Sequence, residues 1–500
     1  MQPWPGRPRG SNPVDSPKPA ARSGGVVGIL AFAGIVAALT QTLVVPLIGE
    51  LPTMFDTSAS NASWVITATL LAAAVATPVA GRLGDMYGKR RMLLVSLVPL
   101  ILGSVVCALS SSVVPMIAGR GLQGLGMGVV PLGISLLRDV VPAEKLGSSI
   151  AIMSASMGVG GALGLPFAAA IAENASWRVL FWVVAALAVA VGTVIWFFVP
   201  AGREKSASGG FDVLGAIGLG AALICLLLGV SKGADWGWGS ATTLGLLAAA
   251  VVLLLAWGRW ELRTGEPLVD LRVTARPQVL MTNAASILVG FAMYAQSLVI
   301  PQLLQIPKAT GYGLGQSMLA MGLWMAPAGL MMMVMSPLGA KLSAVKGPKI
   351  TLSFGSLIIA IGYGISLPLM STGSTWGLLV VTIVCNTGVG FAYGAMPALI
   401  MGAVPQSETA SANSFNTLMR SIGSSVSAAV IGVVLAQMTT DFGGFALPSE
   451  NGFRVAMLIG CGMGLGASIL AFFIPVRAAL AQPETVVTPD PAPEVSATKA

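Results

Sequence analysis

Long apolar stretches and short polar breaks alternate along this chain from about residue 26 to residue 476. Each stretch holds roughly 20 residues, the length that an α-helix needs to cross the ~30 Å hydrocarbon core of a bilayer. Strands of a membrane barrel would instead alternate apolar and polar residues. The pattern therefore predicts fourteen membrane-spanning helices at these positions: 26–48, 62–82, 92–110, 113–136, 148–172, 178–200, 211–231, 242–260, 277–303, 313–338, 348–370, 375–402, 408–437 and 453–476.

Composition agrees with an all-α membrane protein and excludes a soluble one. Hydrophobic residues make up 55% of the 500 residues, charged residues make up 9%, and the mean hydropathy is +0.85. A soluble protein needs far more charge to cover its surface. The chain has no histidine, which excludes histidine-based catalysis and histidine metal ligands. Its four cysteines lie far apart inside apolar stretches, so we expect no metal site, no disulfide, no cofactor and no catalytic residue.

Lysine and arginine residues concentrate in alternate connections between the apolar stretches. Most of the 27 fall on one side if the amino terminus is cytoplasmic, and four fall on the outer side: Arg178, Lys232, Lys308 and Arg454. Cytoplasmic loops of membrane proteins carry such an excess. We therefore predict a multi-pass protein of the inner (plasma) membrane with both termini in the cytoplasm. The net charge of +8 forms no basic stripe, so nucleic acid is not expected as a partner.

Two stretches of the first half recur in the second half. GRLGDMYGKRR at 81–91 resembles GAKLSAVKGPK at 339–349, and VPAEKLGSSIA from Val141 aligns with VPQSETASANS from Val404 at a similar offset. A shared offset indicates a duplicated six-helix unit, an arrangement that transporters build around a midplane cavity. The predicted division is a disordered cytoplasmic tail, a six-helix bundle, a linker with two membrane helices, a second six-helix bundle and a second disordered tail: 1–25, 26–200, 201–276, 277–477 and 478–500.

The connection at 81–91 carries the most specific local pattern in the chain. Gly81 and Gly88 allow a tight reversal between two helices, where a side chain would clash. Asp85 is the one acid there, and three bases follow it: Lys89, Arg90 and Arg91. A plain cation-rich cytoplasmic loop requires the bases, but it explains neither the glycines nor the aspartate.

GRLGDMYGKRRMLL resembles the G-x-L-x-D-x-x-G-(R/K)-(R/K) signature of the major facilitator superfamily. SWVITATLLAAAVATPVA and GYGLGQSMLAMGLWMAP are similar to its fourteen-helix drug:proton antiporter branch. The resemblance covers about 26–477 and implies the major facilitator fold, with two six-helix bundles and two central linker helices. In that family the motif aspartate latches the two halves in the outward-facing state. The resemblance therefore implies that Asp85 pairs with Arg138 and faces the start of the span at 408–437.

Arg120 lies inside the apolar stretch MIAGRGLQGLGMGVVP, where an unpaired charge costs about 3 kcal/mol. Gln123 and Met127 share its helix face. Arg120 either faces a wet cavity or a partner, or extends toward the outer interface. The stretch resembles the family's R-x-x-Q-G motif, whose arginine is linked to proton transfer. That resemblance implies that Arg120 and Gln123 take part in proton coupling.

GVGGALGLPFAAA resembles the family's antiporter motif G-x-x-x-G-P-x-x-G-G, although Leu165 intrudes and alanines replace the last two glycines. The residues that match it are these: Gly160, Gly161, Gly164 and Pro166. Ordinary helix packing explains small residues here equally well. As a resemblance, the motif favours export over uptake.

No acid lies near the middle of any predicted span, and the stretch Thr40-Gln41-Thr42 stands where relatives in this branch often carry an aspartate in a D-x-T pattern. A site for cations needs a buried carboxylate. We therefore predict neutral, zwitterionic or anionic amphipathic substrates ahead of quaternary cations. The first and fourth helices of each half line the cavity in this superfamily, which makes these the polar candidates: Thr40, Gln41, Asn283, Gln296, Asn386 and Tyr393. Asn416 and Arg420 are further buried polar candidates, with Arg420 either a gate or a packing residue.

These features predict proton-coupled secondary active efflux of a drug or small amphipathic metabolite by alternating access. A major facilitator importer or facilitator of a small nutrient is the alternative. A membrane enzyme would need paired acids or a nucleophile beside a base, and the sequence shows neither beyond the loop that carries Asp85. The sequence also has no phosphate-binding loop, so we do not expect ATP to drive transport. The expected partners are a small molecule, protons and membrane lipid. The sequence leaves the oligomeric state open, with a monomer as one option.

Overall fold

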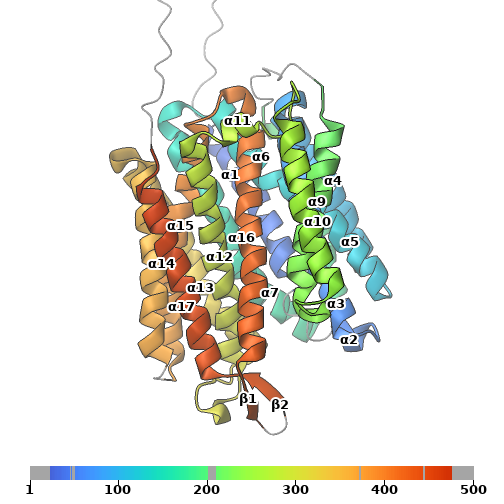
Figure 1. Ribbon diagram of the computed structural model, residues 1–500, viewed down its shortest axis with the longest axis vertical. Helices are drawn as coiled ribbons and strands as arrows, with labels where there is room; N and C mark the ends of the chain where they lie inside the picture. Colours follow the sequence, from blue (N-terminus) through green and yellow to red (C-terminus); the bar gives the residue numbers. More distant parts are fainter. Residues whose placement is uncertain are drawn as a thin grey trace, which may run out of the picture.

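The computed structural model describes these residues: 23–44, 47, 51–200, 210–370, 373–442 and 445–475. Within them, fourteen helices are long and apolar enough to cross a membrane, which confirms the predicted number. The long helices run side by side, with their axes close to one common direction (Figure 1). The predicted tails fall almost wholly outside the described residues, as does 201–209.

The first six spans form one group of packed helices. The fourth is interrupted at its middle by a 3-10 turn, Gly126–Gly128, where glycines follow one another closely. A short helix, α2, follows the first span. The bounds are as follows: α1 Ser23–Thr42, α2 Leu51–Met54, α3 Ala59–Tyr87, α4 Lys89–Leu109, α5 Val113–Leu125, α6 Val129–Val140, α7 Ala143–Asn174 and α8 Arg178–Phe198.

Two linker helices and a short helix precede the last six spans. A two-stranded antiparallel hairpin joins α16 to α17 at the lower end of the molecule (Figure 1). The bounds are as follows: α9 Val213–Trp236, α10 Ala241–Glu261, α11 Leu271–Thr274, α12 Pro277–Gln305, α13 Met318–Lys346, α14 Pro348–Met370, α15 Thr375–Met401, α16 Thr409–Gln437, β1 Thr439–Phe442, β2 Phe445–Pro448 and α17 Glu450–Phe472.

The two halves turn their chains in the same way at matching places. Gly88 links α3 to α4 with a φ of 94°, and Gly347 links α13 to α14 with a φ of 90°. Residues with a side chain rarely adopt such angles, so glycine is the residue that this reversal requires. The resemblance of 81–91 to 339–349 therefore corresponds to a shared backbone turn. Asp85, however, has no acidic counterpart, because the second stretch carries no acid.

Each half has its own hydrophobic core, one formed by α1 and α3–α8 and the other by α12–α17. The halves meet where α7 packs along α13 and α3 packs along α16. Glycines bring the first pair together, since a Cβ on Gly329 would lie 2.2 Å from that of Ala162. Linker helix α9 covers the second seam through Leu219 and Leu223, which join Phe415 in a third apolar cluster. The interface between the halves therefore includes two close helix pairs.

We call the upper end of Figure 1 the cation-rich end. It carries the α3–α4, α6–α7 and α15–α16 connections and α11, with nearby cations that include Lys89, Arg138, Arg272 and Arg276.

Candidate functional site

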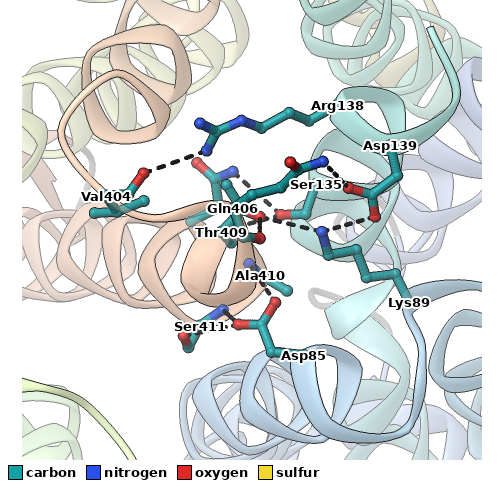
Figure 2. A network of polar contacts seen from close by, with 11 residues as sticks. Asp85, Lys89, Ser135, Arg138, Asp139, Val404, Gln406, Thr409, Ala410 and Ser411 are labelled. Carbon is teal, nitrogen blue, oxygen red and sulfur yellow. Dashed lines mark hydrogen bonds and ion pairs between the residues drawn. The ribbon is translucent and has the colours of Figure 1, made fainter. Parts of the chain in front are cut away.

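At the cation-rich end, Asp85 binds the amino terminus of α16. Its carboxylate accepts hydrogen bonds from the backbone N–H groups of Ala410 at 3.0 Å and Ser411 at 2.8 Å. The Ser411 hydroxyl donates a third bond at 2.9 Å (Figure 2). The first N–H groups of a helix have no partner within the helix, and the helix dipole favours an anion there. Asp85 therefore fastens α3 to the start of α16.

The family resemblance implied that Asp85 pairs with Arg138, and this prediction is wrong. No ion pair joins the two among the described residues, and Arg138 Nη1 instead donates to the Val404 carbonyl at 3.5 Å. The carboxylate of Asp85 already accepts hydrogen bonds from backbone N–H groups at the start of α16, which have no partner within that helix. Lys89 forms the ion pair of this region, with Asp139 at 2.8 Å.

Further polar contacts join the halves around this anchor. Lys89 Nζ also donates to the Thr409 hydroxyl at 3.1 Å, and Ser135 donates to the Thr409 carbonyl at 3.1 Å. Gln406 donates to Asp139 at 3.2 Å, so α6 is joined to the second half as well (Figure 2). We call the contacts made by Asp85, Lys89, Ser135 and Asp139 with residues 406–411 the latch.

The other predicted latch residues differ in where they lie. Gly81 allows close contact across the seam, because a Cβ there would lie 2.4 Å from Ser414 Oγ. Gly88 makes the turn described above. Arg90 points away from the second half, since it donates to the Trp196 carbonyl of α8 and lies 6.0 Å from that ring.

Arg120 is enclosed within the first half rather than in the space between the halves. It is 2% exposed, and its Nη1 donates to the Thr40 carbonyl at 2.8 Å and to Gln123 Oε1 at 2.7 Å. Its Nε donates to the Val65 carbonyl at 3.3 Å. Gln123 passes the network on to Ser104 Oγ at 2.8 Å. One guanidinium thus ties the ends of α1 and α3 to α5.

These contacts decide between the two interpretations of Arg120. The side chain has partners inside the bundle and does not extend to the outer interface. Its recorded partners are carbonyl and amide oxygens, and no carboxylate is among them. The Thr40 carbonyl belongs to the last turn of α1, where carbonyls lack helical partners and a cation is favourable.

The glycines that resemble the antiporter motif have unequal surroundings in α7. A Cβ on Gly160 would lie 2.6 Å from the Ile35 carbonyl of α1, and one on Gly164 would lie 2.0 Å from Thr42 Oγ1. A Cβ on Gly161 would meet nothing within 4 Å. Pro166 lies instead beside Gly322 of α13. Close helix packing accounts for Gly160 and Gly164, and the space beside Gly161 is open.

A small cavity lies between the halves, next to the latch. Its lining comes from α6, α7, α15 and α16, as follows: Pro131, Ile134, Ser154, Met157, Tyr393, Pro397, Asn413, Asn416, Thr417 and Arg420. Of the six predicted cavity residues, Tyr393 lines it. Asn283 accepts a hydrogen bond from Asn416 at 2.9 Å and borders a second hollow beside α11.

The other four predicted cavity residues do not line this cavity. Thr40 donates to the Val36 carbonyl within its own helix, and Asn386 donates in the same way to Thr382. Gln41 donates to Met127 Sδ at 3.3 Å, and Gln296 is buried in α12. The sequence prediction included Asn416 and Arg420 of this lining but missed Asn413 and Thr417. The missed residues had a recognisable spacing, because each lies three or four positions from another polar lining residue of α16.

A family model described as the Major Facilitator Superfamily matches residues 30–428. The chain belongs to this superfamily. It is 30% identical over 450 residues to an "Uncharacterized MFS-type transporter" of Mycobacterium tuberculosis, covering 88% of this chain and 63% of that protein's length. It is 26% identical to "Multidrug resistance protein 3" of Bacillus subtilis, over 83% of this chain and 80% of that protein. It is 28% identical to the "Tetracenomycin C resistance and export protein" of Streptomyces glaucescens, over 77% and 70%.

A solved structure of another superfamily member has the same fold. The human organic anion transporter MFSD10 superposes with a TM-score of 0.63 at 15% identity, over 91% of this chain and 100% of that one. The chain is therefore a multi-pass membrane protein that belongs to a superfamily of transporters. The family is one of transporters rather than enzymes.

Proposed function

We propose that this transporter exports a drug or small amphipathic metabolite across the plasma membrane, in exchange for protons. Two of its relatives bear names that specify multidrug resistance, or resistance to tetracenomycin C and its export. The excess of cations at one end of the bundle supports a cytoplasmic location for that end and for both termini.

The observation that carries the proposal is the latch beside the cavity. Alternating access requires contacts that close one end of the pathway and can later be released. The contacts of Asp85 and Lys89 with the start of α16 are polar and confined to the cation-rich end. Their release would open the cavity at Tyr393 and Arg420 toward the cytoplasm, and their return would close it.

Proton uptake acts, in this proposal, on the latch. A carboxylate that takes up a proton loses its charge and part of its capacity to accept hydrogen bonds. Protonation of Asp85 therefore weakens the hold on α16. In this proposal Arg120 and Gln123 serve coupling indirectly, because they join α1, α3 and α5 so that these helices move as one body.

The test is transport by the purified protein in proteoliposomes carrying a pH-sensitive dye. A panel of neutral, anionic and cationic amphipathic compounds is offered with an imposed proton gradient and without one. We expect at least one compound to drive proton movement, and its accumulation to require the gradient. Equilibration of every transported compound without any proton movement would show a facilitator instead.

A further inference from the structure

The cavity beside the latch contains one cation and no carboxylate. Arg420 of α16 is the charged member of its lining, and polar side chains accompany it from both halves, including Ser154, Asn413 and Thr417. Arg420 is 8% exposed. An arginine buried at this depth is a costly feature unless something offsets its charge.

The position of Arg420 is fixed by the helices around it. Its backbone packs directly against α12, where a Cβ on Gly290 would lie 2.3 Å from the Arg420 carbonyl oxygen. Its guanidinium carbon lies 4.4 Å from the centre of the Tyr393 ring on α15. That ring is held in turn, because the Tyr393 hydroxyl donates to Met293 Sδ at 3.0 Å. The guanidinium is thus presented on a rigid aromatic surface.

Arg420 has no anionic partner in the part of the chain that the structure describes. Among the described residues, the ion pairs join Lys89 to Asp139, Lys232 to Asp235 and Arg454 to Glu450, and none includes Arg420. The Tyr393 ring attracts a cation but leaves the planar N–H donors of the guanidinium able to bind an anion.

The neighbouring side chains supply what an amphipathic ligand needs around such a charge. The Asn413 amide is 3% exposed, and its Oδ1 has no hydrogen-bond partner. On the opposite wall, Ile134 and Met157 provide apolar surface, of which the methionine adapts its shape readily. An acidic group at Arg420 would therefore have the apolar side chains of α6 and α7 next to it.

We propose that Arg420, stacked on Tyr393, binds the acidic group of an amphipathic organic anion that this protein transports. The inference rests on the proposed export function and specifies its substrate class. A carboxylate, sulfonate or phenolate would form charge-assisted hydrogen bonds with the guanidinium. A quaternary ammonium compound would instead meet an unopposed positive charge. The same residue thereby selects for anions and against cations.

The test uses one aromatic body with three charges: pyrenebutyrate, its primary amide and a pyrene-bearing quaternary ammonium compound. Binding to the purified protein in lipid nanodiscs is followed by energy transfer from tryptophan to pyrene. We expect the anion to bind about 10- to 100-fold more tightly than the amide, the range for hydrogen bonds to a charged group. In Arg420→Gln this preference disappears while the amide binds as before. Arg420→Lys retains part of it.

The matched control is Arg454→Gln, which removes one positive charge at the opposite end of the protein, outside the cavity. It should keep the full preference for the anion. Retained amide binding distinguishes loss of charge selection from loss of folding. Equal affinity of Arg420→Gln and the unaltered protein for the anion would overturn the inference, as would a preference for the cation or failure to bind the anion.

The outcome is separable from that of the export proposal. If the preference for the anion does not depend on Arg420 while some other compound is still exported in exchange for protons, the export proposal is supported and the anion site is refuted. If anion binding depends on Arg420 while no compound moves protons, the anion site is supported and proton-driven export is refuted.

Discussion

Asp85 of α3 and Ser411 of α16 are joined by two hydrogen bonds across 326 positions of sequence. One comes from the backbone N–H and one from the hydroxyl, and Ala410 adds a third. Because two of the three donors are backbone groups, no substitution on α16 can remove them without deforming the helix. The acid is therefore the side of the latch that mutation can test directly.

Asp85→Asn should weaken the latch, lower transport and leave membrane insertion intact. The amide keeps one acceptor, but it loses the charge and turns an N–H₂ group toward N–H donors. A loss of about 1.5–3 kcal/mol shifts the balance between closed and open states by about 10- to 100-fold. The measurement is maleimide labelling of Thr417→Cys from the cation-rich side, after replacement of the four native cysteines.

Ser411→Ala should have a smaller effect than Asp85→Asn, because it removes only one of the three hydrogen bonds that Asp85 accepts. Its labelling rate should lie between those of the unaltered protein and Asp85→Asn. Identical labelling in all three proteins, together with full transport, would refute the latch.

Gly81→Ala should separate α3 from α16 and reduce transport by about tenfold or more. A Cβ there would lie 2.4 Å from Ser414 Oγ and 2.7 Å from the Ala410 carbonyl, which is backbone and cannot rotate away. Such overpacking costs about 1–3 kcal/mol. Gly121→Ala is the control, because a Cβ at Gly121 meets nothing within 4 Å. Substrate flux per folded protein is the measurement, and equal flux in the two variants contradicts the prediction.

The sequence was sufficient to predict the membrane-spanning helices and the glycine turn that occurs once in each half. Span length is dictated by bilayer thickness, and the glycine turns by backbone sterics, so both are local properties. The partner of Asp85 was not predictable in the same way. The family resemblance implied Arg138, whereas two of the three actual donors are backbone N–H groups of Ala410 and Ser411. These groups are available to Asp85 because they lie in the first turn of α16, where they have no partner within the helix.

The residues that line the cavity could also be predicted only in part from the sequence. Tyr393 was found because it lies on a helix expected to face the centre, while Asn413 and Thr417 were missed. Their spacing along α16 with Arg420 was visible in the sequence. Which face of α16 points inward, however, depends on how α3 and α12 pack against its other faces.

Gly164→Val and Gly161→Val should behave differently although both lie in one motif. A Cβ on Gly164 would lie 2.0 Å from Thr42 Oγ1 and 3.4 Å from Leu39, so a larger residue forces α7 away from α1. Gly161 has open space beside it. We expect Gly164→Val to lower thermal stability in detergent and to abolish transport, with Gly161→Val close to the unaltered protein in stability. The reverse order would mean that the motif acts through something other than packing.

Arg120→Lys should lower stability and slow substrate and proton movement together. A lysine carries its three donors on a single nitrogen, which cannot lie both at the Nη1 position, beside the Thr40 carbonyl and Gln123, and at the Nε position, beside the Val65 carbonyl. Leaving one of these buried acceptors unpaired costs about 1–3 kcal/mol. The measurements are the melting temperature in detergent and the ratio of protons to substrate moved in proteoliposomes. If Arg120 acts by holding α1, α3 and α5 together, the substitution lowers the melting temperature and both fluxes, while the ratio of protons to substrate stays constant. If Arg120 itself carried the proton, the substitution would change the ratio and leave the melting temperature unaltered, and that result would restore a direct coupling role.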